Sequence, residues 1–264
     1  MDDARSGLRA ILVATAIAGV ASYLVTWFVP RVIGFADYAT FAVFWAALYL
    51  VVGTLSGLQQ EVTRATVPLS GDAPAHVNRA RNFGLIAAVV TFVVVLAVAF
   101  TSPFAWPLAF GTASYALVAV LVGTLFGLSR WRAAAALVLV DALLRLVAIL
   151  LTLLFTHDIV ALAWAAAVPF GLALIVVWPF ARKAVVGKAQ LDVGYGRLSW
   201  NVSRTLLAAA STGVMVSGFP LLLGLTSPGA DSVQLGLYIL AATLVRAPLV
   251  VVHVTAELPC GAIP

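Results

Sequence analysis

Eight long apolar runs divide this sequence, and they limit its fold more than any other feature. A helix needs roughly 20 apolar residues to cross a hydrocarbon core about 30 Å thick. These runs are continuous and do not alternate with polar residues, so they predict transmembrane helices and exclude a β-barrel. The predicted spans cover about residues 8–29, 37–58, 83–101, 104–128, 133–156, 159–180, 205–226 and 233–254.

The composition agrees with lipid as the main solvent. Of the 264 residues, 63% are hydrophobic and only 9% are charged, with a mean hydropathy of +1.11. A soluble domain has roughly 25% charged residues, and no soluble fold of this size could bury so much apolar surface. The run from Leu8 to Val29 exceeds the usual signal-peptide core of about 7–15 residues, so it predicts an uncleaved first span.

The basic residues predict the orientation of the chain. If the N-terminus is cytoplasmic, Arg31 is the only basic residue in the outer loops. Membrane proteins typically have this asymmetry, with Lys and Arg concentrated in the cytoplasmic loops. The net charge of +5 belongs to these loops, and no basic run is long enough to predict a nucleic-acid partner. Twelve of the fifteen Lys and Arg residues then lie inside: Arg5, Arg9, Arg64, Arg79, Arg81, Arg130, Arg132, Arg182, Lys183, Lys188, Arg197 and Arg204.

Motifs for catalysis, metal binding or cofactor binding are absent from the sequence. His76, His157 and His253 have no metal-ligand spacing, and there is no Walker A or GxGxxG pattern. A single cysteine, Cys260, excludes an internal disulfide and a CxxC site. We therefore expect no catalytic residue, no metal and no cofactor, and we predict that the chain is not an enzyme.

Two Gly-x-x-x-Gly pairs lie near the predicted cytoplasmic ends of the second and fourth spans. They are Gly53 with Gly57 and Gly123 with Gly127. Small residues let helix backbones approach closely in lipid, so the pairs predict helix-packing faces. The alternative is that they line a cavity or a hinge.

A polar cluster follows the first glycine pair at the membrane boundary. It consists of Gln59, Gln60, Glu61 and Arg64. Because Glu61 and Arg64 are three residues apart, they can pair on one helix face. The functional hypothesis is a cytoplasmic gate or a headgroup contact, and the alternative is an ordinary interfacial cap.

Three charged residues lie well inside predicted spans, away from their ends, where charge is costly. Asp141 and Arg145 are four residues apart and can form an ion pair on one helix face. Arg246 lies two residues before Pro248, which removes a backbone donor. We predict that Asp141, Arg145 and Arg246 line a cationic substrate pathway that suits a phosphate-bearing anion. The alternatives are a structural ion pair for the first two and a side chain that reaches the cytoplasmic interface for Arg246.

Several stretches resemble known membrane transporters. "GFADYATFAVFWAALYLVVGTLSGLQQEVTRA" resembles the first two helices of polysaccharide-biosynthesis flippases, with Gly34, Tyr38 and Phe41 at their Gly-x-x-x-Tyr-x-x-Phe motif. "GLSRWRAAAALVLVDALLRLVAILL" and "LGLYILAATLVRAPLVVV" resemble their helix 4–5 passage and helix 8. The family is the O-antigen and polysaccharide branch of the multidrug/oligosaccharidyl-lipid/polysaccharide (MOP) exporter superfamily.

The resemblance implies an all-α, MATE-like bundle of two six-helix lobes around a central cavity. Residues 1–181 would form the first lobe, 182–204 a basic cytoplasmic linker, and 205–264 two helices of an incomplete second lobe. Such flippases move a polyprenyl-diphosphate-linked oligosaccharide from the inner to the outer leaflet of the plasma membrane, coupled in many cases to H⁺ or Na⁺.

The family has twelve or more helices, so we expect a truncated product that is inactive as a fragment or acts as a homodimer. The alternatives are an ion-coupled drug or small-metabolite exporter of the same superfamily and a non-transporting membrane scaffold that binds partner helices. A membrane glycosyltransferase or polymerase is disfavoured, because its usual large outer loop is missing. Membrane lipids are expected partners in every case.

Overall fold

The computed structural model describes residues 2–68, 80–186, 188–226 and 231–256, with the backbone alone at 2–5, 184, 216, 225 and 245–256. The described residues form an all-α bundle, which confirms the predicted fold class. Its helices are α1 (Asp2–Ile33), α2 (Phe35–Ala65), α3 (Ala80–Ala99), α4 (Ala105–Gly127), α5 (Trp131–Phe155), α6 (Ile159–Val185), α7 (Tyr195–Thr226) and α8 (Ser232–Ala256).

Each predicted apolar run coincides with one of these helices. Six of them, α1 to α6, are long and apolar enough to cross a membrane, as in a multi-pass membrane protein. Two segments of α7, Tyr195–Met215 and Ser217–Gly224, meet this criterion only when they are taken together as one bent span. The apolar part of α8 found among the described residues, Ser232–Leu244, is shorter than a span. The total of eight transmembrane spans therefore stays a prediction.

The bend in α7 has a local cause. Its two segments meet at an angle of 69° around residue 216. Pro220 lies four residues later in the same helix. A proline has no N–H for the carbonyl one turn back, and its ring clashes with that carbonyl, so the helix bends there.

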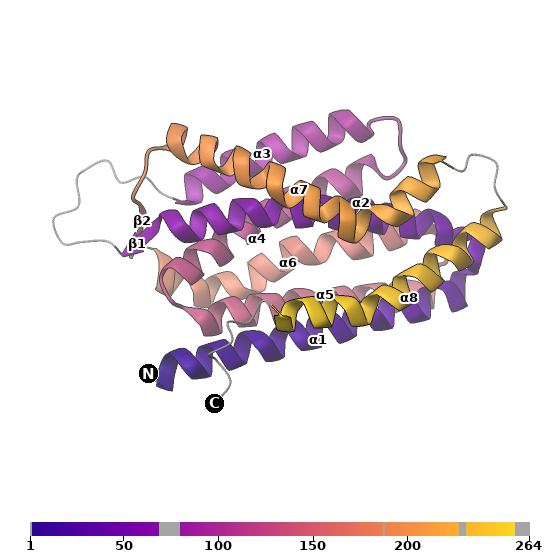
Figure 1. The fold of residues 1–264 in the computed structure, drawn as a ribbon, viewed down its shortest axis with the longest axis horizontal. Helices are drawn as coiled ribbons and strands as arrows, with labels where there is room; N and C mark the ends of the chain where they lie inside the picture. The colour runs from indigo at the N-terminus through magenta and orange to yellow at the C-terminus, as the bar shows by residue number, and fades with distance from the viewer. Residues whose placement is uncertain (1, 69–79, 187, 227–230, 257–264) are drawn as a thin grey trace.

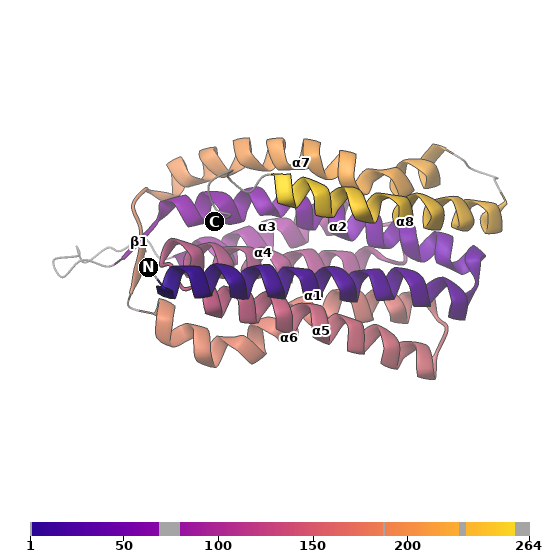
Figure 2. The same cartoon turned by 60° about the horizontal axis from the view of Figure 1, so that its bottom comes forward.

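The helices lie side by side along the long axis of the molecule, and the chain passes back and forth between its two ends (Figures 1 and 2). Helix α2 has the most neighbours, since it packs extensively against α7, α4 and α8. The other close pairs are α1 with α5, α5 with α6, α4 with α6, and α3 with α4. The predicted division into two lobes stays a prediction, and in this structure α7 and α8 both lie against α2.

The outward faces of the bundle are apolar. Large hydrophobic side chains such as Val98 on α3 and Phe155 on α5 are 84% and 86% exposed. On a soluble protein, apolar surface of this extent would be an aggregation hazard, whereas lipid tails solvate it without cost. By contrast, most residues of α4 are buried inside the bundle.

Two short strands join the end of α2 to the segment before α7. Strand β1 (Thr66–Pro68) pairs antiparallel with β2 (Ala189–Leu191), with Thr66 opposite Leu191. The Asp192 N–H extends the pairing by donating to the Ala65 carbonyl at 2.9 Å. The predicted linker 182–204 therefore contains the end of α6, this strand and the start of α7, so it is tied to α2.

Two helix junctions depend on backbone with positive φ. Gly34 has φ of 83° between α1 and α2, which suits glycine because it has no Cβ. Ser129 has φ of 55° after α4. Its N–H donates to the Phe126 carbonyl at 2.9 Å, and the Arg130 N–H donates to Leu125 at 2.7 Å. This is a Schellman motif with serine at the position usually held by glycine.

Candidate functional site

A cavity lined in part by hydroxyl and amide side chains lies between α2 and α7. Its volume is about 400 Å³. On α7 its lining runs from Thr205 to Gly213, about 12 Å at a helical rise of 1.5 Å per residue, and includes Ser217 beyond the bend. Among the described residues, the lining contains no charged side chain and consists of Gly53, Ser56, Gln60, Thr205, Ala208, Ala209, Thr212, Gly213 and Ser217.

Most of the polar side chains that line the cavity make no hydrogen bond to other described residues. Within the described part of the chain, Ser56, Gln60, Thr212 and Ser217 make no side-chain hydrogen bond, whereas other Ser and Thr residues of these helices bond a carbonyl of the preceding turn. Unpaired polar groups are costly in an apolar setting. Gln60 and Thr212 are exposed, so these groups are free to bond a polar ligand between the two helices.

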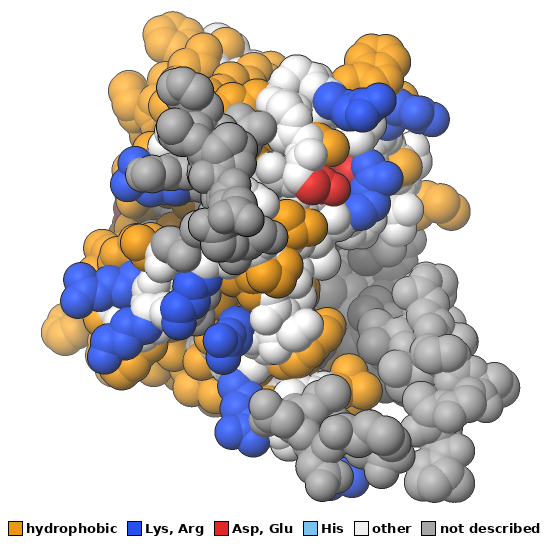
Figure 3. All heavy atoms as spheres, turned by 90° about the vertical axis from the view of Figure 1, so that its left-hand side faces the viewer, with side chains coloured by type: hydrophobic (Ala, Val, Ile, Leu, Met, Phe, Trp, Pro, Cys, Tyr) orange, Lys and Arg blue, Asp and Glu red, His pale blue; other side chains and the backbone are white. Residues whose placement is uncertain are grey.

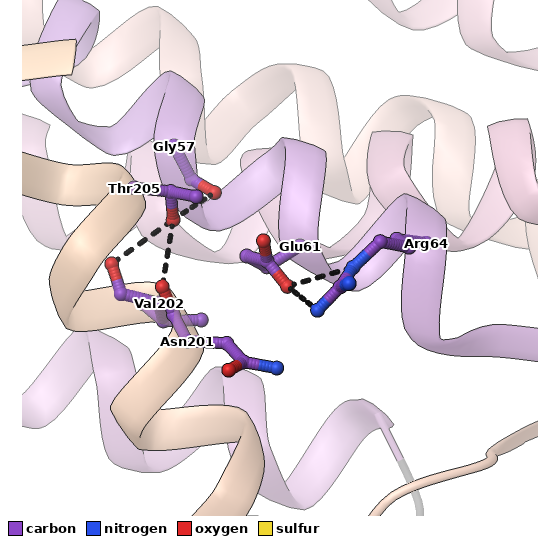
Figure 4. Close-up of polar contacts among 6 residues, drawn as sticks. All are labelled: Gly57, Glu61, Arg64, Asn201, Val202 and Thr205. Carbon is purple, nitrogen blue, oxygen red and sulfur yellow. Dashed lines mark hydrogen bonds and ion pairs between the residues drawn. The ribbon is translucent and has the colours of Figure 1, made fainter. Parts of the chain in front are cut away.

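One hydroxyl of the lining joins the two helices. The Thr205 Oγ1 lies 3.1 Å from the Gly57 carbonyl oxygen of α2, and 3.2 and 3.0 Å from the carbonyls of Asn201 and Val202. Figure 4 shows this threonine reaching α2 beside the Glu61–Arg64 pair. The hydroxyl thus joins α7 to α2 at one end of the cavity, and we call this α2–α7 contact the seam.

The first glycine pair lies on this seam. A Cβ on Gly57 would lie 2.6 Å from the carbonyl carbon and oxygen of Thr205, so only glycine permits this approach. A Cβ on Gly53 would meet nothing closer than the Gly213 Cα at 3.9 Å. Gly57 thus makes a close backbone contact with α7, whereas Gly53 leaves space in the cavity wall.

The second glycine pair faces another neighbour. A Cβ on Gly123 of α4 would lie 2.7 Å from the Gln59 carbonyl oxygen, and one on Gly127 would lie 2.6 Å from the Thr66 Cβ. Both positions pack α4 against α2, on a face that does not line the cavity. The two pairs of the sequence therefore hold α2 between α7 and α4.

The residues of the predicted gate lie in different surroundings. Gln60 lines the cavity, whereas the Gln59 backbone lies against α4. Glu61 is 9% exposed, and its Oε2 accepts bonds from Arg64 Nη2 at 2.8 Å and Nε at 3.1 Å. The Arg64 side chain is 67% exposed. The predicted pairing is present, and the gating role stays a prediction.

A second, smaller cavity adjoins this pair at the end of the bundle. Its volume is about 240 Å³. It lies where the end of α2, the residues after β2 and the first turns of α7 meet. The lining consists of Arg64, Ala65, Asp192, Val193, Arg197 and Asn201.

Basic side chains gather at this end of the molecule (Figure 3). Of the described acidic side chains, only Glu61 and Asp192 lie there. The opposite end has Arg31, Asp37, Asp158 and Asp231 near its helix termini. The described basic residues at the end with the strands are Arg9, Arg64, Arg81, Arg130, Arg132, Arg182, Lys183, Lys188, Arg197 and Arg204.

Asp141 and Arg145 form an enclosed ion pair on α5. Arg145 is 5% exposed, and its Nη2 donates to both Asp141 carboxylate oxygens at 2.7 and 2.6 Å. Its Nη1 donates to the Tyr49 hydroxyl of α2. The guanidinium carbon also lies 4.0 Å from the centre of the Phe170 ring of α6. The pair therefore links three helices through an ion pair, a hydrogen bond and a cation–π contact.

These contacts match the structural alternative for the two residues. Neither Asp141 nor Arg145 lines either of the two cavities. The Arg145 Nε is buried and has no hydrogen-bond partner among the described residues. Arg246 lies in α8, but its side chain is outside the described part of the chain. The proposed substrate pathway through these three residues stays a prediction.

Several residues of these sites carry no signal in the sequence. Ser56, Thr205, Thr212 and Ser217 were missed because single hydroxyl residues are common in membrane helices and carry no motif. Tyr49 was missed because it meets Arg145 from a position 96 residues away. Among the described residues, no group of three His, Cys, Asp or Glu side chains is arranged to hold a metal ion.

The chain is similar to mycobacterial proteins of unassigned activity. It is 29% identical over 253 residues to the uncharacterized protein Rv3630 of Mycobacterium tuberculosis, a match that covers 90% of this chain and 58% of the relative. It is 31% identical over 273 residues to the uncharacterized protein Rv1510 of the same species, covering 94% and 60%. The chain thus spans about three fifths of the length of these curated relatives. No family model and no solved structure matches it.

Proposed function

We propose that this chain is a membrane transporter of the flippase type, which moves a polyprenyl-diphosphate-linked oligosaccharide from the inner to the outer leaflet of the plasma membrane. The proposal rests on one observation, the cavity of unpaired hydroxyl and amide groups between α2 and α7. A saccharide presents many hydroxyl groups, and it would supply the hydrogen bonds that these side chains lack.

The position of the cavity suits such a cargo. It lies along a seam between two apolar helices, so a polar headgroup could enter the seam while a prenyl chain stays in lipid. Substrate sites of many transporters lie at the junction of two repeats, and bent helices take part in them. The seam of α2 with the bent helix α7 is the corresponding junction if the predicted lobes exist.

The basic side chains at one end of the bundle support an orientation of the chain in the membrane. Because cytoplasmic loops are rich in Lys and Arg, we place the basic end of the bundle and the N-terminus in the cytoplasm. An anionic diphosphate would then meet a basic surface at the leaflet where the cargo is loaded.

A second candidate is an exporter of a neutral drug or small metabolite. The larger cavity favours it, since none of its described lining residues has a charge that would pair with a phosphate. Both candidates use the α2–α7 seam, and they differ in cargo.

A substitution that fills the larger cavity tests whether the cavity takes part in transport. Thr212→Leu would place an apolar side chain in the cavity, whereas Ser211→Leu changes the adjacent exposed hydroxyl, which is not part of the lining. Each variant is reconstituted in vesicles with a fluorescent, short-chain polyprenyl-diphosphate saccharide. The outward movement is then measured by the loss of fluorescence when a membrane-impermeant quencher is added.

We expect the unaltered chain, acting as a homodimer, and Ser211→Leu to move the lipid. Thr212→Leu should do so roughly tenfold more slowly, as when an unpaired polar contact costs about 1.4 kcal/mol. No movement above that of empty vesicles by the unaltered chain would refute the flippase proposal. Equal rates for the two leucine variants would instead separate the activity from this cavity. Transport of a neutral fluorescent amphiphile alone would favour the second candidate.

A further inference from the structure

The smaller cavity at the basic end has charges of both signs that the protein does not pair. Arg197 and Asp192 both line it, and within the described part of the chain neither side chain takes part in a salt bridge or a hydrogen bond. Arg64 also lines it, with its guanidinium bound on one side by Glu61. The cavity therefore offers a free cation and a free anion in one space.

Three separate elements hold these groups in place. The backbone of Asp192 is fixed by its bond to the Ala65 carbonyl, next to Arg64 at the end of α2. Arg197 and Asn201 lie one turn apart on the same face of α7. Figure 4 shows the Asn201 side chain extending from α7 near the Glu61–Arg64 pair. The cavity is thus built by the strand pairing and by the start of α7, not by one flexible loop.

The charge pattern determines which ligand fits. A simple anion would meet the Arg64 and Arg197 guanidinium groups, but it would also meet the unpaired Asp192 carboxylate. A ligand with a phosphate and an ammonium group would satisfy both signs. Guanidinium groups bind phosphate through paired N–H donors, and an ammonium donates hydrogen bonds to a carboxylate.

We propose that this cavity binds the phosphoethanolamine headgroup of a zwitterionic phospholipid. The phosphate contacts Arg197 and Arg64, the Asn201 amide donates to a phosphate oxygen, and the ammonium group contacts Asp192. The volume of about 240 Å³ accommodates a headgroup of this kind. The position at the basic end of the apolar helices is the level at which a lipid headgroup lies. The lipid is a bound component of this surface and is independent of the transported cargo.

Four soluble probes test the proposal on the purified chain in detergent. They are dihexanoyl-phosphatidylethanolamine, the phosphatidylcholine and phosphatidylglycerol analogues with the same chains, and inorganic phosphate. The choline group has no N–H to donate, and the glycerol group has no positive charge. Binding is followed by titration calorimetry for the unaltered chain and for Asp192→Asn, Arg197→Gln and Arg204→Gln, the last being an exposed basic residue of α7 outside the cavity.

We expect phosphatidylethanolamine to bind about tenfold more tightly than the other three probes, as for one charge-assisted contact. Arg197→Gln should weaken its binding by about tenfold, and Arg204→Gln should leave it unchanged. Asp192→Asn should remove the preference for ethanolamine over glycerol. Since Asp192 and Arg197 are exposed, these variants should fold, and an unchanged melting temperature verifies this.

Three results would overturn the proposal. Equal affinity for phosphatidylglycerol that is insensitive to Asp192→Asn would identify a general anion surface. Inorganic phosphate that binds as tightly as the lipid would show that no headgroup is recognised. Unchanged lipid binding by Arg197→Gln would place the lipid elsewhere.

Discussion

Gly57 of α2 lies against the main chain of Thr205 on α7, and the Thr205 hydroxyl is 3.1 Å from the Gly57 carbonyl oxygen. The absence of a side chain at one position and the hydroxyl at the other produce a single contact between two helices 148 residues apart in sequence. In lipid, such contacts replace the hydrophobic effect as the reason for helices to associate. The larger cavity begins directly beside this contact, so packing and cavity shape are linked.

Gly57→Ala should destabilise the α2–α7 seam. The new Cβ would lie 2.6 Å from backbone atoms that cannot move independently, and overpacking of this kind costs about 1–3 kcal/mol. Gly53→Ala is the matched control, since its Cβ would be 3.9 Å from the nearest atom. Thermal unfolding in detergent should show a lower melting temperature for the first variant only. Equal melting temperatures would contradict the close contact.

Removal of one partner of the buried ion pair should be more damaging than removal of both. Arg145→Met leaves Asp141 enclosed and unpaired, and breaking a buried pair costs about 3–5 kcal/mol. The double variant Asp141→Leu with Arg145→Met leaves no charge behind, so its unfolding free energy should lie closer to that of the unaltered chain. Chemical denaturation of the unaltered chain and of these two variants measures this difference.

The same double variant separates the two hypotheses for this pair. If Asp141 and Arg145 only join helices, the double variant should keep the transport rate of the unaltered chain in the vesicle assay. If they contact the cargo, transport should be lost although the protein remains folded. The enclosed contacts with Tyr49 and Phe170 favour the first outcome.

The helices could be predicted closely from the sequence because lipid imposes a strong length requirement. Every apolar run corresponds to a helix, with most ends within a few residues. The start of α7 at Tyr195 was placed ten residues too late, at about residue 205, because its first turns are polar and basic. The strand pairing of Thr66 with Leu191 was not predicted, since each strand is only three residues long.

The candidate site was harder to predict than the fold. Local spacing was sufficient to indicate the Glu61–Arg64 and Asp141–Arg145 pairs, because both lie within one helix turn. The larger cavity depends on which face of α7 meets α2, and helical spacing alone contains no information on the partner. Ser56 and Thr212 gain significance only when the two helices are placed side by side.

Ser129→Gly should stabilise the turn between α4 and α5. Serine there has φ of 55°, a conformation that costs a side-chain-bearing residue roughly 1 kcal/mol and that glycine adopts freely. The expected result is a rise of a few degrees in melting temperature at most, since glycine also increases the entropy of the unfolded chain. Ser129→Val should lower the melting temperature, because a β-branched residue tolerates this backbone poorly. A melting temperature that is highest for the valine variant would contradict the Schellman geometry.

Single cysteines at the two ends of the bundle should be labelled from opposite sides of the membrane. In a background with Cys260→Ser, Asn82→Cys marks the basic end and His157→Cys marks the turn between α5 and α6. Both positions are exposed, so their reactivity should not be limited by burial. A membrane-impermeant maleimide should label His157→Cys in right-side-out vesicles and Asn82→Cys in inside-out vesicles, because the excess of Lys and Arg retains the basic end in the cytoplasm. Labelling of both from one side would mean that α3, α4 and α5 do not cross the membrane an odd number of times, and the reverse pattern would invert the orientation on which cargo loading at the basic surface depends.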